Sequence, residues 1–231
     1  MRSKHKLAYI ALSCMLLLSG VVLLVNVRAQ ATKQARVTFN SDRDGNWEVY
    51  VMDADGKNPR NLTNNPGDDL FPAWSPDGQR IVFTSLRDGN NEIYVMDADG
   101  ENPHRLTNNP ASDDFPAWSP DGQRIVFTSL RDGNDEIYVM GAAGRNPYRL
   151  TNNPAFDICP VWSPDGQRIA FASLRDGNWE VYVMDADGKN PRNLTNNSAG
   201  DEHPDWFDPA YGVSPAGKLK ARWGWLKQTS K

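Results

Sequence analysis

Cysteine is scarce in this sequence, and its two cysteines offer no internal disulfide to a secreted domain. Cys14 lies within an apolar N-terminal run, Leu7 to Val27, and Cys159 is the only cysteine after that run. The three residues before Cys14 make a poor lipidation signal, and the apolar run continues well beyond it. A lone thiol cannot cross-link a domain, so packing must supply the stability.

Basic residues are also few in the body of the chain. All 29 Asp and Glu residues lie within residues 32–208, which hold 16 of the 25 Lys and Arg residues. An acidic body does not suit a phosphate backbone, so we expect no nucleic-acid partner. Residues 209–231 hold five basic residues and no acid. In this basic tail Trp223 and Trp225 belong to an alternating apolar pattern, which predicts a strand packed on the body.

Helical periodicity and catalytic motifs are missing after residue 31. No segment there repeats its apolar residues with a period near 3.6, so helices are not expected to cover a sheet. The nearest approach to a nucleophile elbow, Gly212 to Ala216, lacks the closing glycine. All three histidines precede Ser214, whereas a hydrolase of that type places its histidine after the nucleophile. We therefore expect no enzyme, no catalytic residue and no cofactor.

The N-terminus has the features of an export signal. Arg2, Lys4 and Lys6 precede the apolar run, and Ala29 to Ala31 offer the small residues of a cleavage site. Residues 1–31 are therefore predicted to be a signal peptide of a periplasmic or secreted protein. The run is also close to the roughly 20 residues that span a bilayer. The alternative is an uncleaved inner-membrane anchor at residues 7–27, which would be the only contact with a membrane.

A repeat of 44 residues organises the rest of the chain. Its tryptophans, Trp74, Trp118, Trp162 and Trp206, are 44 residues apart, a period typical of stacked or circular repeat architectures. Within one unit the short runs FPAW, RIVFTS, EIYVM and HRLT are separated by turns that combine Gly or Pro with Asp or Asn. The pattern predicts four antiparallel strands in each unit.

The third run indicates how the units meet. Ile93 and Val95 point to one face of the predicted strand, and Tyr94 and Met96 point to the other, so both faces are apolar. Without helices, the sheet of the next unit has to cover them. Four-stranded sheets packed face to face around an axis form a β-propeller, so residues 32–208 are predicted to be an all-β propeller with antiparallel blades. The recurring tryptophan is then a core or inter-blade residue.

The phase of the repeat predicts how the ring closes. The chain enters its first unit at the second strand, near Arg36, and His203 to Trp206 correspond to the first strand of a further unit. Pairing this C-terminal strand with the strand Val37 to Phe39 would close a ring of four blades and remove two open faces. The alternative is that the open faces close by pairing with a second chain.

At this level of detail the repeat resembles a known family. The segment PAWSPDGQRIVFTSLRDGNNEIYVMDADGENPHRLT closely resembles the WD-like repeat of TolB-type β-propellers, over roughly residues 36–207. The resemblance implies a Gram-negative periplasmic or secreted protein whose propeller binds other proteins. We therefore expect a non-enzymatic exported scaffold in the cell envelope, with an envelope protein or peptide as partner. The alternative is a carbohydrate-binding or polysaccharide lyase-like propeller with a glycan ligand.

A metal site is not expected, although DADG resembles part of a calcium loop. Asp97 and Asp99 recur in other copies, but the third copy reads Gly141 to Gly144 with both carboxylates lost and the final glycine kept. The position therefore needs a residue that adopts positive φ more than it needs charge. A hairpin turn explains it better than a cation site.

Candidate binding residues lie on one face of the predicted propeller, where the turns after the second strands meet the connections between units. Recurring charged residues gather there: Arg43, Arg87, Arg131, Arg175, Asp69, Asp113, Asp157 and Asp201. They are interpreted either as mutual ion pairs that tie blades together or as a polar ring that binds a peptide or a sugar. No carboxylate pair differs from its counterparts as an acid and a base should.

The export prediction can be tested on the mature protein. A periplasmic fraction should contain a species that begins near Thr32, because cleavage is expected after Ala31. N-terminal sequencing measures this directly. An intact Met1 in the membrane pellet would instead support the anchor at residues 7–27.

Overall fold

The computed structural model describes residues 35–207. The predicted signal or anchor, residues 1–31, and the tail, residues 209–231, fall outside the described residues. The described residues contain fifteen strands and no helix, and so no helix that could cross a membrane. The strands are β1 (Arg36–Ser41), β2 (Glu48–Asp53), β3 (Arg60–Asn61), β4 (Asp69–Trp74), β5 (Arg80–Ser85), β6 (Glu92–Asp97), β7 (His104–Arg105), β8 (Asp113–Trp118), β9 (Arg124–Ser129), β10 (Glu136–Gly141), β11 (Tyr148–Arg149), β12 (Asp157–Trp162), β13 (Arg168–Ser173), β14 (Glu180–Asp185) and β15 (Arg192–Asn193).

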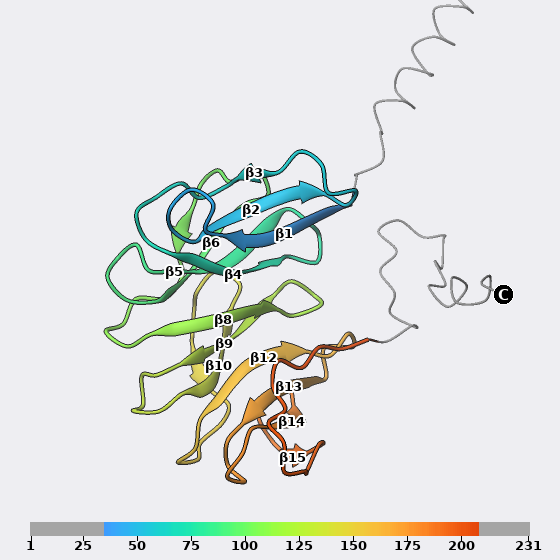
Figure 1. Cartoon of the computed structure of the whole chain (residues 1–231). Coiled ribbons are helices and arrows are strands. Elements are labelled where there is room, and N and C mark those ends of the chain that lie inside the picture. The colour runs from blue at the N-terminus through green and yellow to red at the C-terminus, as the bar shows by residue number, and fades with distance from the viewer. Residues whose placement is uncertain (1–34, 208–231) are drawn as a thin grey trace, which may run out of the picture. The chain divides into compact units, whose positions relative to one another are not determined.

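These strands form four antiparallel sheets that follow the 44-residue units (Figure 1). The first sheet has the order β1-β2-β3, the second β4-β5-β6-β7, the third β11-β10-β9-β8 and the fourth β12-β13-β14-β15. Each complete sheet is a meander of hairpins, because every connection is a tight turn that joins neighbouring strands. The predicted four-stranded units are confirmed, and the fourth strand of each is only two residues long.

The expected pairing that would close the ring is not present among the described strands. The first sheet contains only β1, β2 and β3, and residues 201–207 form no strand. The described residues therefore contain four blades without the closing strand.

The turn at DADG confirms the hairpin interpretation. Gly100 has φ 95°, and Gly144, in the copy without carboxylates, has φ 74°. A Cβ atom built on Gly144 would lie 2.6 Å from the carbonyl oxygen of Leu106, which directly follows the last strand of the preceding sheet. The glycine is therefore needed both for the left-handed turn and for the close approach of two sheets.

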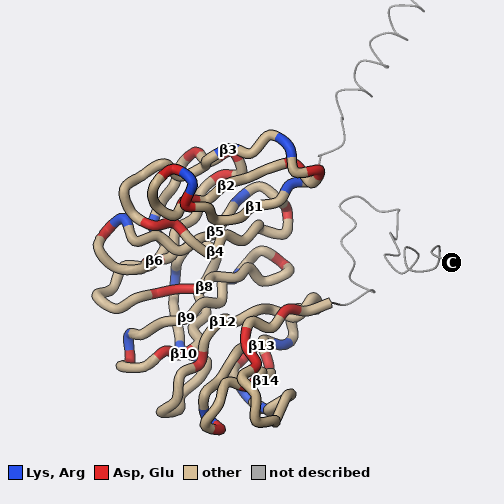
Figure 2. The backbone as a smooth tube through the Cα atoms, viewed as in Figure 1, with Lys and Arg blue, Asp and Glu red and all other residues tan. Residues whose placement is uncertain are grey.

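The core lies between consecutive sheets, as the two apolar faces of each unit predicted. The first strand of each sheet lies against the sheet before it: β8 contacts β4, β5 and β6, and β12 contacts β8, β9 and β10. In one layer Val82, Ile93 and Val95 of the second sheet pack against Trp118 and Phe127 of the third. Most Lys, Arg, Asp and Glu residues lie at strand ends and turns (Figure 2). The expectation that the recurring tryptophan packs between blades is confirmed.

The layer between the second and third sheets and the layer between the third and fourth sheets also hold an arginine over the tryptophan. The guanidinium carbon of Arg80 lies 4.7 Å from the ring centroid of Trp118, and that of Arg124 lies 4.3 Å from Trp162. Such a contact keeps the charge near water while the aliphatic part of the side chain covers the indole.

Truncation of Phe127 tests this packing. Phe127 is fully buried between the second and third sheets, so Phe127→Ala should lower the free energy of unfolding by about 3–5 kcal/mol. Urea denaturation measures the loss, and Tyr148→Ala, at an aromatic residue that is 49% exposed, is the control. A loss below about 1 kcal/mol for Phe127→Ala would contradict the inter-sheet core.

Candidate functional site: the connection rim

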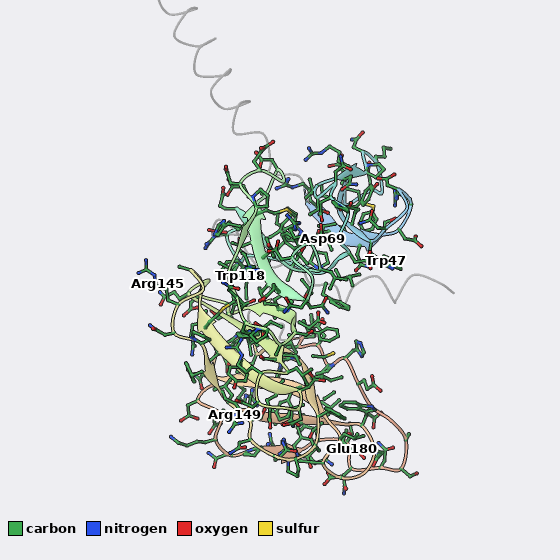
Figure 3. All side chains as sticks on the ribbon, turned by 90° about the vertical axis from the view of Figure 1, so that its left-hand side faces the viewer. Trp47, Asp69, Trp118, Arg145, Arg149 and Glu180 are labelled. Atoms are coloured by element: carbon green, nitrogen blue, oxygen red, sulfur yellow. The ribbon has the colours of Figure 1, made fainter. Side chains whose placement is uncertain are left out.

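One rim of the propeller is built by the loops after the second strands and by the connections between sheets. We call it the connection rim, and its loops span residues 42–47, 86–91, 130–135 and 174–179, with the connections 62–68, 106–112, 150–156 and 194–200. Trp47, Asp69 and Glu180 lie on this side of the molecule, and Arg145 lies on the opposite side (Figure 3). The predicted charged residues are therefore on the rim where strand direction placed them.

Three of the predicted arginine and aspartate pairs form buried ion pairs on this rim. In the third sheet Arg131 Nη2 lies 2.9 Å from both oxygens of Asp113, whose side chain is 0% exposed. Arg131 Nε donates to Ser129 Oγ at 2.7 Å, and the guanidinium lies 4.5 Å from the ring centroid of Tyr138. The same arrangement joins Arg87 to Asp69 and Arg175 to Asp157. The expected ion pairs are present, but each pair lies within one sheet and not between two.

Asparagine residues make the link between sheets instead. Asn109 Nδ2 donates to Asp113 at 2.7 Å, and the Asn109 backbone N–H donates to Glu92 of the second sheet at 3.2 Å. Glu92 is buried and also accepts a hydrogen bond from Thr107 Oγ1 at 2.6 Å. Every oxygen of this buried network has a donor, which a buried carboxylate requires. The network repeats as Glu48–Asn65–Asp69 and Glu136–Asn153–Asp157.

Two of the eight predicted residues, Arg43 and Asp201, have no ion pair among residues 35–207. Arg43 keeps the local arrangement, since its Nε donates to Ser41 Oγ at 2.9 Å and its guanidinium lies 4.3 Å from the Tyr50 ring centroid. Asp201 keeps the asparagine bond, since Asn197 Nδ2 donates to it at 2.5 Å. The residue one repeat before Asp69 is Val25, and the residue one repeat after Arg175 is Leu219. Neither side chain can form an ion pair.

Several residues that differ between the otherwise similar copies also lie on the connection rim or next to it. Four such positions of the repeat include the two at which all four copies differ, those of Asp68 and Leu70. We call these the variable positions: Trp47, Asn91, Asp135 and Trp179 before the third strands; Asp68, Ser112, Phe156 and Gly200 before the first strands; Leu70, Asp114, Ile158 and Glu202; and Phe71, Phe115, Cys159 and His203. Our sequence analysis named the charged residues that recur and missed these, although a comparison of the copies would have revealed them.

A backbone irregularity shapes one set of variable positions. The pairing of β4 with β5 shifts between Leu70 and Ala73, as the pairing of β8 with β9 does at the equivalent place. Phe71 and Phe115 both have φ 52°, an unusual value for a bulky side chain. Their rings meet with centroids 4.3 Å apart. Such bulges re-aim side chains, and their strain is most often found near functional sites.

The electrostatics of the variable positions are dominated by partly buried acids. Burial raises the pKa of Asp114 above its ordinary value, although Asn91 Nδ2 donates a hydrogen bond to its carboxylate at 2.7 Å. Burial also raises the pKa of Asp135. Burial first, and then the negative charges of Glu202, Asp114 and Asp135, raise the pKa of the Cys159 thiol to about 12. The thiol is therefore protonated near neutral pH and is a poor nucleophile.

The connection rim also collects exposed apolar side chains. Of the nine large hydrophobic residues exposed within the described ranges, six belong to the rim or its variable positions and are between 38% and 47% exposed: Trp47, Phe71, Leu86, Leu130, Phe156 and Leu194. Within residues 35–207 no group of three or more His, Cys, Asp or Glu side chains is placed to hold a metal ion. The rim therefore offers aromatic and acidic surface.

Comparison with known proteins agrees with this architecture. Residues 107–210 match the TolB beta propeller domain, and residues 27–133 match the Tricorn protease N-terminal beta propeller domain. The Tol-Pal system protein TolB of Desulfosudis oleivorans is 46% identical over 46 residues, which are 20% of this chain and 10% of that protein.

Solved structures are similar over a longer part of the chain. A TolB structure from Agrobacterium tumefaciens has a TM-score of 0.64 at 31% identity, and the matched region covers 69% of this chain and 60% of the TolB chain. TolB from Acinetobacter baumannii has a TM-score of 0.64 at 27% identity, with 71% and 42% coverage. An oligogalacturonate lyase from Vibrio parahaemolyticus, at 16% identity and a TM-score of 0.55, shares the fold alone. The chain thus spans only part of the length of its relatives.

The stacked four-stranded sheets and these similarities define the class of protein, an all-β propeller built from sequence repeats. More specifically, the chain is a TolB-type β-propeller repeat protein, as the sequence of its repeat indicated.

The buried ion pair gives a testable prediction for stability. Asp113→Ala removes a carboxylate that is 0% exposed and leaves Arg131 and Asn109 without their acceptor. The free energy of unfolding should fall by about 2–4 kcal/mol, because a broken buried pair leaves an uncompensated charge. Thermal or urea unfolding measures it, with Asp55→Ala in the exposed Lys57 pair as a control that leaves the midpoint unchanged. Equal midpoints for both variants would contradict the role given to the network.

Proposed function

We propose that the protein is a non-enzymatic, protein-binding scaffold of the cell envelope and that the connection rim is its binding surface. The single observation that carries the proposal is the coincidence of two properties on this rim. Six exposed large hydrophobic side chains lie there or at the variable positions, and the two positions at which all four copies differ, those of Asp68 and Leu70, lie there too. Apolar patches rimmed by polar residues mark interaction sites, and repeat scaffolds vary most where they bind.

The chemistry of the rim favours a protein or peptide partner with basic and apolar residues. Trp47, Phe71 and Phe156 are exposed aromatic side chains of the kind that anchor protein interfaces. Asp114 and Asp135 sit in an environment where burial disfavours their negative charge. A cationic group of a partner would stabilise both carboxylates.

In this proposal the recurring arginine and aspartate residues support the surface and do not form it. Asp69, Asp113 and Asp157 are 0% exposed and already accept hydrogen bonds from arginine and asparagine. A ligand could reach these carboxylates only by breaking bonds that hold the connections. Arg43 and Asp201, at the two ends of the series, are the members of the set with free bonding capacity within the described residues.

Location and partner follow from the same proposal. The predicted signal at residues 1–31 supports a periplasmic or secreted protein, with an inner-membrane anchor at residues 7–27 as the alternative. A relative is a Tol-Pal system protein, which supports an envelope protein as the partner. Exposed aromatic side chains also stack on sugar rings, and a lyase shares the fold. A carbohydrate-binding or lyase-like propeller is therefore the second candidate, with a glycan as ligand.

Binding experiments with single-residue variants separate these functions. Trp47→Ala and Phe156→Ala should each reduce the protein retained from an envelope extract by about tenfold, because each variant removes an exposed aromatic anchor. The matched control is Tyr148→Ala, an exposed aromatic residue of β11 outside the connection rim. Mass spectrometry identifies the retained protein, and the same three variants are tested against envelope polysaccharides. Loss of glycan binding alone would favour the second candidate, and equal retention by all variants would contradict a role for the rim.

A further inference from the structure

We infer that two copies of this chain associate by strand exchange, in which residues Asp201–Trp206 of one copy complete the first sheet of the other. The inference is independent of the partner proposed above. It rests on an acceptor edge at β1, on a donor segment already shaped like a first strand, and on the charges of Arg43 and Asp201.

The acceptor is the edge of β1, which lacks the first strand that the other sheets have. The strands β5, β9 and β13 each pair with a first strand and are almost entirely buried, whereas every residue of β1 is exposed or only partly buried. Val37 is 41% exposed, although the equivalent Ile81 and Ile125 are 0% exposed. An uncovered edge with an apolar side chain is a template for another strand.

Arg43 gives this edge a preformed charge. Its Nε bond to Ser41 and its position over the Tyr50 ring reproduce those of Arg131 on Ser129 and Tyr138. In the third sheet that arrangement directs the guanidinium at Asp113. In the first sheet no described carboxylate takes that place, so an aspartate at the start of an added strand would find its partner already oriented.

The donor segment, residues Asp201–Trp206, has the conformation of a first strand without a sheet partner. The Asp201 backbone N–H donates to the Trp179 carbonyl at 2.8 Å, as Asp157 donates to Asp135 at 2.8 Å. His203 has φ 56°, close to the 54° of Cys159 in β12. The guanidinium carbon of Arg168 lies 4.9 Å from the Trp206 ring centroid, which repeats the contact of Arg124 with Trp162.

The repeat predicts the register of the new pair. In the fourth sheet Asp157 pairs with Ser173, Val161 with Ala170 and Trp162 with Ile169. One repeat on, the same register pairs Asp201 with Ser41, Asp205 with Thr38 and Trp206 with Val37. This pairing would place the Trp206 indole over the exposed Val37 side chain. It also brings the Asp201 carboxylate to the Arg43 guanidinium, so the two residues of the series that have no ion pair become partners.

The structure favours a second copy over the chain's own segment as the occupant. Residues 201–206 lie on the fourth sheet, through the contacts of Asp201 and Trp206, and β1 is not paired with them. Among the described strands, none of the fourth sheet is seen to pack against the first sheet, whereas a second copy can supply the missing strand.

Cysteine cross-linking between two chains tests the exchange and its register. In a background of Cys14→Ser and Cys159→Ser, a full chain with Thr38→Cys is mixed with a full chain that carries Asp205→Cys. Residues directly opposite in an antiparallel pair have Cα atoms about 4.5–5.5 Å apart, within the range of a disulfide. We expect a cross-linked species of two chains on a non-reducing gel. Lys57→Cys, in the exposed turn after β2, replaces Thr38→Cys as the control and should not cross-link to Asp205→Cys.

The double variant Thr38→Cys/Asp205→Cys distinguishes a second copy from closure within one chain. Cross-linked dimers or larger species support the exchange. A monomer with a single internal disulfide would overturn it in favour of a self-closed ring. The single-chain mass in light scattering, together with no cross-link in the mixture, would also overturn it.

Charge reversal tests the predicted ion pair. Arg43→Asp and Asp201→Arg should each weaken association by about tenfold or more, because each places like charges opposite each other at the new interface. The double variant Arg43→Asp/Asp201→Arg should recover association, and Arg145→Ala on the opposite rim should not change it. Melting temperatures of all variants exclude unfolding as the cause. Failure of the double variant to recover association would contradict the Arg43–Asp201 contact.

Discussion

A buried carboxylate, with an arginine on one side and an asparagine on the other, holds each connection between sheets in place. Asp113 takes its hydrogen bonds from Arg131 of its own sheet and from Asn109 of the preceding connection, and Asn109 in turn reaches Glu92 in the sheet before it. The connection cannot move without leaving a buried charge unpaired, which is far more costly than losing an apolar contact. The step from one sheet to the next is therefore determined by polar chemistry at the rim and by apolar packing beneath it.

This division of tasks explains why one rim can vary while the fold stays constant. The residues that build the network recur in every copy, whereas Leu70, Asp114, Ile158 and Glu202 occupy one position with four different side chains. The backbone at the neighbouring position keeps its left-handed conformation whether the residue is Phe115, Cys159 or His203. The strain is therefore a property of the scaffold, and the side chain displayed there is free to differ.

Much of the fold could be predicted from the sequence, because period, turn chemistry and two-faced strands are local signals. The runs RIVFTS and EIYVM became β5 and β6 with nearly the expected bounds, and Trp118 and Trp162 became inter-sheet residues. The proposed binding surface was harder to predict. Strand direction placed Arg131 and Asp113 on the correct rim. Whether a recurring charged side chain is exposed or forms an ion pair with a neighbour, however, depends on three-dimensional contacts. That their pair lies within a sheet, and that Asn109 links the sheets, depends on side-chain reach, which spacing alone does not give.

The near identity of the inter-sheet layers has a consequence for the growth of such chains. The layer between the second and third sheets and the layer between the third and fourth are built from equivalent residues, Val82, Ile93 and Val95 in one and Val126, Ile137 and Val139 in the other. Any sheet of this kind is therefore a suitable neighbour for any other, and stability is approximately a sum over adjacent pairs. Duplication or loss of a whole 44-residue unit would replace one such layer with another of the same composition. The gene of such a protein can change length in steps of one blade while every surviving contact keeps its geometry.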